Sequence, residues 1–144
     1  MADEPIRVCL MIEGQEDVGW DHWRALAEAC ERGGFDTLFR SDHYISVDDR
    51  RERGALEAWG TICGLAATTS RIGLGTLVSP VTFRHPSVLA KLAVTADHIS
   101  GGGRIEVGLG GRMVGGRTSP LRLSLPPDGH ADGDARGAAG DRSQ

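Results

Sequence analysis

Residues 72–110 decide the fold, and they read IGLGTLVSPVTFRHPSVLAKLAVTADHISGGGRIEVGLG. An apolar run of strand length opens the stretch at 72–78, and a similar run at 104–109 closes it. Pro86 suits the first turn of a helix between the two runs, and the glycines at 101–103 end that helix. A strand, a helix and a second strand in this order form a right-handed crossover, so the two strands are predicted to be parallel.

The same theme occurs twice upstream. Apolar runs at 6–12 and 35–40 predict two more strands, and each precedes a segment with apolar residues at helical spacing. Asp21 is the predicted N-cap of the first helix, and Gly33-Gly34 is its predicted end. The predicted buried faces are Trp23, Leu26, Ala27 and Cys30 in the first helix, Leu56, Trp59, Ile62, Cys63 and Ala66 in the second, and Leu89, Leu92, Ala93 and Ala96 in the third.

Strict alternation of strand and helix predicts an α/β fold with a parallel sheet. Short strands that end in glycine favour the N-terminal part, about four βα units, of a (β/α)8 TIM barrel, whose full form takes about 250 residues. An open doubly wound sheet is the alternative, but its nucleotide-binding signature is missing. The Gly108-Leu109-Gly110 sequence has Met113 where the third glycine of that signature belongs.

Composition narrows the class of protein. The formal net charge of -4 over 144 residues provides no basic surface for nucleic acid or an anionic membrane. No apolar run approaches the roughly 18 residues of a membrane span, and no leader-like start is present. Three widely spaced cysteines predict buried, reduced thiols in a cytoplasmic protein. The histidines and cysteines lack zinc-site spacing, so no metal site is predicted.

The segment 111–144 differs in character from residues 1–110. It is rich in Gly, Asp and Arg and shows no periodicity of helix or strand, which predicts a disordered tail. We expect this tail to be unrelated to the domain of residues 1–110 and to come from a one-base frameshift at about Gly110-Gly111.

Catalytic groups of a barrel lie at the carboxyl ends of its strands. The most informative such segment is Ser41-Asp42-His43-Tyr44, because a carboxylate beside a histidine can support acid–base chemistry. The alternative is that Ser41 or Asp42 caps the next segment and His43 is a surface loop residue. Glu13 is a weaker candidate that a neighbouring arginine could equally well pair, and Asp97-His98 is interpreted as structural.

Six motifs occur in a fixed order and carry a family resemblance. They are residues 11–15 (MIEGQ), 41–44 (SDHY), 75–80 (GTLVSP), 82–86 (TFRHP), 97–102 (DHISGG) and 104–110 (RIEVGLG). Together they resemble the luciferase-like monooxygenase superfamily, and most closely its coenzyme F420-dependent oxidoreductases.

The resemblance implies hydride transfer between coenzyme F420, a deazaflavin, and a small organic substrate. It makes His43 the acid–base residue and implies cofactor contacts at Asp42, Thr76, Leu77 and Ser79. It also implies a non-proline cis peptide at Thr76-Leu77, in a bulge behind the deazaflavin ring.

Two alternatives stay open: an FMN-dependent monooxygenase of the same superfamily, and a non-catalytic barrel fragment. Only four strand units are visible, so we expect the chain to be truncated, marginally stable and inactive. Its free sheet edges predict self-association into a homo-oligomer.

Overall fold

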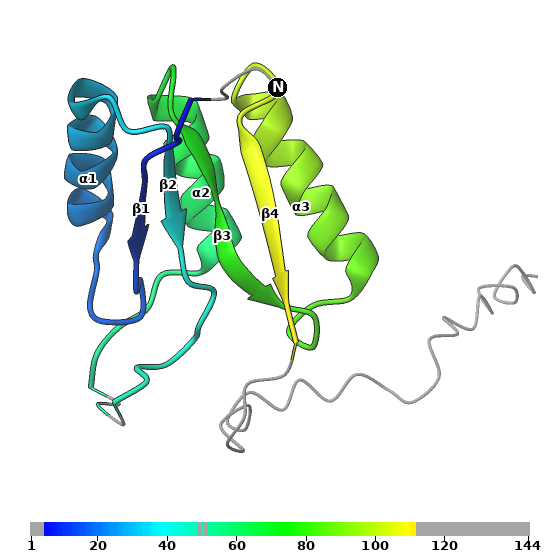
Figure 1. Cartoon of the computed structure of the whole chain (residues 1–144). Helices are drawn as coiled ribbons and strands as arrows, with labels where there is room; N and C mark the ends of the chain where they lie inside the picture. The colour runs from blue at the N-terminus through cyan, green and yellow to red at the C-terminus, as the bar shows by residue number, and fades with distance from the viewer. Residues whose placement is uncertain (1–4, 49, 51, 112–144) are drawn as a thin grey trace, which may run out of the picture. The chain divides into compact units, whose positions relative to one another are not determined.

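Strands and helices alternate along the chain, as the apolar spacing predicted. The computed structural model describes residues 5–48, 50 and 52–111 (Figure 1). The expectation of a disordered, frameshifted tail therefore falls outside the described residues, Gly111 excepted. The elements are β1 (Cys9–Ile12), α1 (Trp20–Gly33), β2 (Thr37–Arg40), α2 (Ala58–Thr68), β3 (Gly73–Pro80), α3 (Pro86–Ile99) and β4 (Ile105–Gly110).

The four strands form one parallel sheet in the order β1-β2-β3-β4. The three helices pack along the same side of this sheet, with α2 between α1 and α3 (Figure 1). A doubly wound sheet has helices on both faces and reverses its strand order. The described residues do neither, so the predicted α/β fold is confirmed and the doubly wound alternative is excluded for them.

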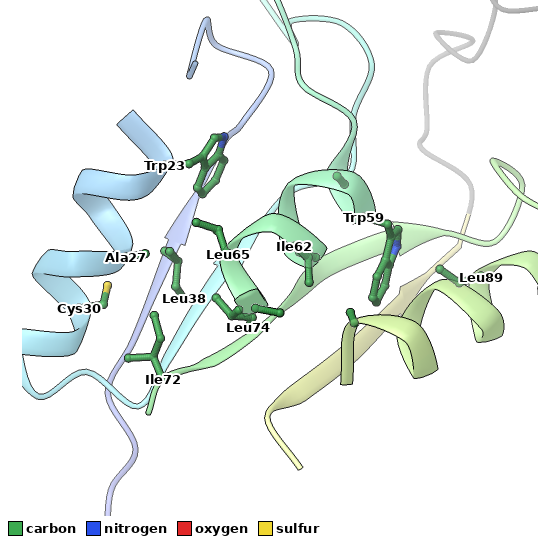
Figure 2. Close-up of a cluster of buried hydrophobic side chains, with 13 residues drawn as sticks. Trp23, Ala27, Cys30, Leu38, Trp59, Ile62, Leu65, Ile72, Leu74 and Leu89 are labelled. Atoms are coloured by element: carbon green, nitrogen blue, oxygen red, sulfur yellow. The ribbon is translucent and has the colours of Figure 1, made fainter. Parts of the chain in front are cut away.

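The core lies between the sheet and the helices. Leu10, Leu38, Leu74 and Ile105 are register partners across the four strands. Leu38 and Leu74 belong to the apolar cluster (Figure 2), and Leu10 and Ile105 pack against it. Alternation along each strand sends these side chains to one face of the sheet. The helices contribute Trp23, Ala27, Cys30, Ala58, Trp59, Ile62, Leu65, Ala66, Leu89 and Ala96 to this cluster.

A cluster of polar contacts spans the opposite face of the sheet. Arg7, just before β1, forms an ion pair with Glu106 of β4, and both side chains bond to the Thr37 hydroxyl at 2.6 and 2.9 Å. These contacts cross three strand spacings, about 14 Å in a flat sheet. These contacts tie the segment before β1 to β2 and β4 across this face of the sheet.

Helix α1 begins earlier than predicted. Its N-cap is Gly19, whose N–H donates to Nδ1 of His22 at 3.2 Å, so the prediction of Asp21 as the cap was wrong. Asp21 lies in the first turn instead, where a negative charge suits the positive end of the helix dipole. The predicted end is confirmed, because Gly34 adopts the left-handed conformation with φ 75°.

Two further details differ from the sequence prediction. Leu56 lies outside α2 and is 40% exposed, because the helix begins only after Glu57, its N-cap. Cys9 is exposed, because it lies on an edge strand and points away from the helices. Cys30 is buried, Cys63 is partly buried, and all three thiols are free.

Glu31 links the end of α1 to the start of β3. Its carboxylate accepts the backbone N–H groups of Ser70, Arg71 and Ile72 at 2.8, 2.8 and 3.3 Å. Burial alone would raise the pKa of Glu31, but these N–H groups and the Arg71 charge lower it below its ordinary value of 4.5. A carboxyl whose folded pKa is depressed stabilises the fold above the unfolded pKa, and this contribution disappears as the pH falls through the folded pKa.

We therefore expect Glu31→Gln to lower the free energy of unfolding by about 1 kcal/mol at pH 7 and to have little effect below the folded pKa of Glu31. Urea unfolding of both proteins across this pH range measures the difference. Glu28→Gln is the matched control, because Glu28 forms an exposed ion pair with Arg32 on the same helix. An equal loss at pH 7 and at low pH would contradict the assigned role of the carboxylate.

Candidate active site

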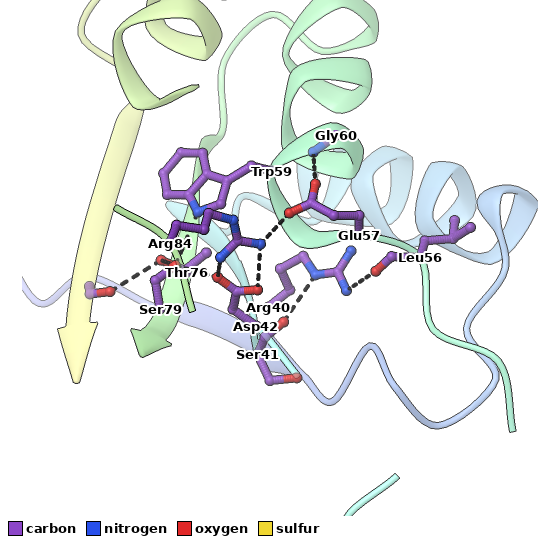
Figure 3. A network of polar contacts seen from close by, with 11 residues as sticks. Arg40, Ser41, Asp42, Leu56, Glu57, Trp59, Gly60, Thr76, Ser79 and Arg84 are labelled. Carbon is purple, nitrogen blue, oxygen red and sulfur yellow. Dashed lines mark hydrogen bonds and ion pairs between the residues drawn. The ribbon is translucent and has the colours of Figure 1, made fainter. Parts of the chain in front are cut away.

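A buried ion pair joins the segments that follow β2 and β3. Arg84 donates to Asp42 through both terminal nitrogens, from Nη1 to Oδ2 at 2.5 Å and from Nη2 to Oδ1 at 3.0 Å (Figure 3). The two side chains are only 9% and 1% exposed. Paired donors of this kind fix the orientation of a carboxylate as well as its charge.

A chain of hydrogen bonds extends from this ion pair into the core. Trp59 Nε1 donates to Ser79 Oγ at 3.0 Å, and Ser79 Oγ donates to Asp42 Oδ2 at 2.7 Å (Figure 3). Ser79 Oγ also lies 3.1 Å from the hydroxyl of Thr76, which donates to the carbonyl of Gly108 at 3.2 Å. The chain of hydrogen bonds therefore connects α2, β3 and β4 to the segment that follows β2.

Glu57 joins the same network from the start of α2. Its carboxylate accepts the Gly60 N–H at 2.6 Å, which caps the helix, and it forms an ion pair with Arg84. Burial alone would raise the pKa of Glu57, but the Gly60 N–H and Arg84 lower it. Burial alone would likewise lower the pKa of Arg84, but its two carboxylate partners raise it. Each partner thus favours the charged form of the other.

Arg40 of β2 lies beside this network and is 1% exposed. It donates from Nε to the carbonyl of Ser41 at 3.1 Å and from Nη2 to that of Leu56 at 2.8 Å, and it stacks over Trp23. Burial lowers the pKa of Arg40 to about 10, so its guanidinium stays charged at neutral pH. Within the described residues its Nη1 has no hydrogen-bond partner.

Three predicted cofactor contacts are buried. Asp42 is 1% exposed, and Thr76 and Ser79 are 0% exposed. These residues lie on the helix side of the sheet edge, where their polar atoms bond within the network. They have no exposed surface with which to contact a ligand, so below we assign them a supporting role in place of the direct contact that the resemblance implied.

The other two predicted site residues are accessible. His43 is partly exposed, and Leu77 is 49% exposed. The described residues include no hydrogen bond between Asp42 and His43, because both oxygens of Asp42 face Arg84. Glu13 is exposed and accepts a hydrogen bond from Gln15 at 2.6 Å.

The predicted non-proline cis peptide lies one residue later than expected, at Leu77-Val78 in place of Thr76-Leu77. The pairing of β3 with β4 explains the position. Thr76 still pairs with Val107, and Ser79 pairs with Leu109. Leu77 and Val78 together therefore oppose Gly108 alone, which makes a bulge, and the irregular bond falls inside that bulge.

Aromatic contacts hold the loops above this edge. Tyr44 stacks on Phe83 with ring centroids 4.8 Å apart, and the Arg84 guanidinium lies 5.7 Å from the centre of the Tyr44 ring. Burial raises the pKa of Tyr44, so its hydroxyl stays protonated at neutral pH. The loop after β3 thus contacts the loop after β2 through two adjacent residues.

Sequence reasoning did not find three members of the network, Arg40, Glu57 and Arg84. It predicted that Trp59 lies in the core, which is confirmed at 0% exposure. It did not predict the hydrogen bond from Trp59 to Ser79. One signal was available: residues of opposite charge, Asp42 and Arg84, follow successive strands. Because the carboxyl ends of parallel strands meet at one edge of a sheet, this pattern could have predicted their ion pair. Asp97 is structural as predicted, because it accepts the N–H of Arg104 at 3.2 Å.

The described part of the chain shows no group of three or more His, Cys, Asp or Glu side chains placed to hold a metal ion. Across residues 5–48, 50 and 52–111, no helix has the length and apolar character that crossing a membrane requires.

Comparison with known proteins identifies the class of protein. A sequence model of the luciferase-like monooxygenase family matches residues 6–118, and the chain belongs to this family. The match reaches past Gly110, so it includes the first residues of the segment that we expected to be unrelated.

The chain is 34% identical over 108 residues to 4-hydroxyprotoasukamycin monooxygenase of Streptomyces nodosus subsp. asukaensis, covering 69% of this chain and 26% of the relative. The F420-dependent tetrahydromethanopterin reductase of Methanopyrus kandleri aligns with a TM-score of 0.61 at 25% identity, over 74% of this chain and 27% of that protein. A Baeyer–Villiger monooxygenase of Pseudomonas putida, in complex with FMN, aligns with a TM-score of 0.60 at 19% identity. The alignment covers 73% of this chain and 29% of that protein. The chain thus spans about a quarter of the length of these proteins, and its α/β fold matches theirs.

Proposed function

We propose that residues 6–110 form the first part of an oxidoreductase barrel that binds coenzyme F420 and transfers hydride to or from a small organic molecule. The observation that carries the proposal is that two accessible groups follow or lie on neighbouring strands at the carboxyl edge of the sheet. Leu77 presents an apolar surface on the β3 bulge, and His43 follows β2, the neighbouring strand. The buried network of Asp42, Arg84 and Ser79 joins the segment that contains His43 to the strand that contains Leu77.

The residues present fit a flat, largely apolar ring. The Leu77 side chain is 49% exposed at the bulge. An aromatic ring of the cofactor can cover such a surface and remove it from water, which is favourable by roughly 25 cal/mol per Å². Leu77 is therefore the residue that we assign to hold the ring.

A bound deazaflavin would supply the hydride-transfer chemistry. The side chain of His43 would accept the exchangeable proton of the substrate in one direction of hydride transfer and return it in the other, because an imidazole ring nitrogen can accept or donate a proton. Asp42, Ser79 and Thr76 would keep the loops of the site in place from beneath. The bulge would cover one face of the ring and limit the access of water to it.

The alternative is an FMN-dependent monooxygenase that uses dioxygen. It is supported by the name of the Streptomyces relative and by the FMN in the Pseudomonas structure. The likeness to the F420-dependent reductase and the Ser41–Tyr44 sequence favour the deazaflavin. The apolar side chain of Leu77 suits both the F420 ring and the FMN ring, so a binding measurement is needed to distinguish the two cofactors.

Equilibrium dialysis of the chain against F420 and against FMN tests the proposal. We expect F420 to be retained more tightly than FMN. Leu77→Asp should weaken its retention at least about tenfold, because it places an unpaired carboxylate under an apolar ring. Val94→Asp is the matched control, since Val94 is 64% exposed on α3, away from the site. Retention of neither cofactor, or equal retention by wild type and Leu77→Asp, would refute the proposal.

A further inference from the structure

His43 lies between two residues that the same arginine holds. Asp42, directly before it, receives both terminal nitrogens of Arg84. Tyr44, directly after it, lies under the Arg84 guanidinium and stacks on Phe83, the neighbour of that arginine. Within the described residues the His43 side chain itself makes no recorded hydrogen bond or ion pair, so its place depends on how its two neighbours are fixed.

We propose that Arg84 is a positioning residue that fixes His43 relative to the β3 bulge. The inference rests on the proposed function, in which His43 moves a proton and Leu77 holds the ring. Because Arg84 belongs to the loop that follows β3, its contacts tie the His43 segment to the strand that carries the bulge. The contacts of Arg84 therefore join the two groups that the proposed function requires to act together.

The chemistry of the contact supports this assignment. Arg84 uses a planar fork to bind two carboxylate oxygens, which fixes direction as well as distance. Ser79, on β3 itself, adds a third bond to the same carboxylate at 2.7 Å. A shift of about 1 Å in a reacting group can change a rate by about 10²-fold. A rigid link between the His43 segment and β3 would therefore affect the reaction rate as well as the stability of the fold.

Another arginine offers a matched comparison. Arg104 also makes several hydrogen bonds, to the carbonyls of Ala66, Thr69, Ile72 and Ser100 and to the Thr69 hydroxyl. It lies just before β4, at the amino edge of the sheet, far along the strands from His43. Arg104 therefore tests what the loss of a well-bonded arginine does to the fold without touching the His43 segment.

Nuclear magnetic resonance of the histidine rings in the full chain tests the inference without any cofactor. The variants are Arg84→Lys, which keeps the charge beside Asp42 but loses the fork, and Phe83→Leu, which removes the Tyr44 stack and leaves every charge paired. Spectra are recorded well below the unfolding temperature of each variant. We expect the His43 ring signal to shift and broaden or split in Arg84→Lys, and to a smaller extent in Phe83→Leu.

Arg104→Lys should leave the His43 signal unchanged even if it lowers the unfolding temperature by a similar amount. An unchanged His43 signal in both Arg84→Lys and Phe83→Leu overturns the inference, and so does an equal change in Arg104→Lys. The measurement is independent of the dialysis result: failure to bind F420 or FMN counts against the proposed function, whereas an undisturbed His43 ring counts against the role of Arg84.

Discussion

Replacement of His43 by alanine in a complete barrel that contains residues 6–110 is expected to lower turnover by about 10²–10⁴-fold, the usual contribution of a general acid or base. Cofactor affinity should change little, because Leu77 and the bulge, and not His43, supply the apolar surface for the ring. The fold should also be unaffected, since His43 is partly exposed and has no recorded side-chain partner among the described residues.

Steady-state turnover and cofactor titration of the same preparations separate these two effects. His98→Ala is the matched control, because His98 is exposed in the last turn of α3, away from the carboxyl edge of the sheet. Wild-type turnover in His43→Ala would remove this residue from the mechanism. A large loss of cofactor affinity with unchanged turnover at saturation would instead make His43 a binding residue.

Replacement of Asp42 by alanine is expected to lower the free energy of unfolding by about 3–5 kcal/mol, the usual cost of removing one partner of a buried ion pair. Arg84 would keep its ion pair with Glu57, whose side chain is 47% exposed, but Ser79 Oγ would lose its acceptor at 2.7 Å. The destabilisation comes chiefly from the charge that remains buried, and much less from the energy of the bond itself.

A double-mutant cycle tests that explanation. Asp42→Ala combined with Arg84→Met should be less destabilising than the sum of the two single changes, because neither charge is then left alone. The control is Glu28→Ala, which breaks the exposed Glu28–Arg32 pair and should cost no more than about 0.5 kcal/mol. Additive effects in denaturant unfolding would show that the two residues are not coupled.

Much of the fold followed from local patterns. The order of strands and helices, the parallel sheet and the buried faces of Trp23 and Trp59 could be predicted because apolar spacing and glycine breaks act over a few residues. The ends of elements were less predictable. Gly19 replaces Asp21 as the cap of α1, and Leu56 lies outside α2, because both boundaries depend on bonds formed by particular side chains, namely His22 and Glu57.

The site was predicted only at the level of its segments. The sequence placed Asp42, Thr76, Leu77 and Ser79 near one edge, but three of these side chains face inward and only Leu77 is exposed. Whether a side chain faces the helices or the opposite side of the sheet depends on the strand register and on the bulge. The bulge puts Leu77 and Val78 together opposite Gly108. No spacing rule within one segment contains that information.

By itself, then, the sequence determined the parallel α/β architecture, the family resemblance and the segments that meet at the carboxyl edge, since each depends on residues close together along the chain. Only the tertiary structure decided that Arg84 pairs with both Asp42 and Glu57, and that Arg84 contacts both neighbours of His43. These contacts join residues 27 and 42 positions apart. Charged side chains far apart along the chain can pair in many ways, and it is the folded sheet that selects one of them.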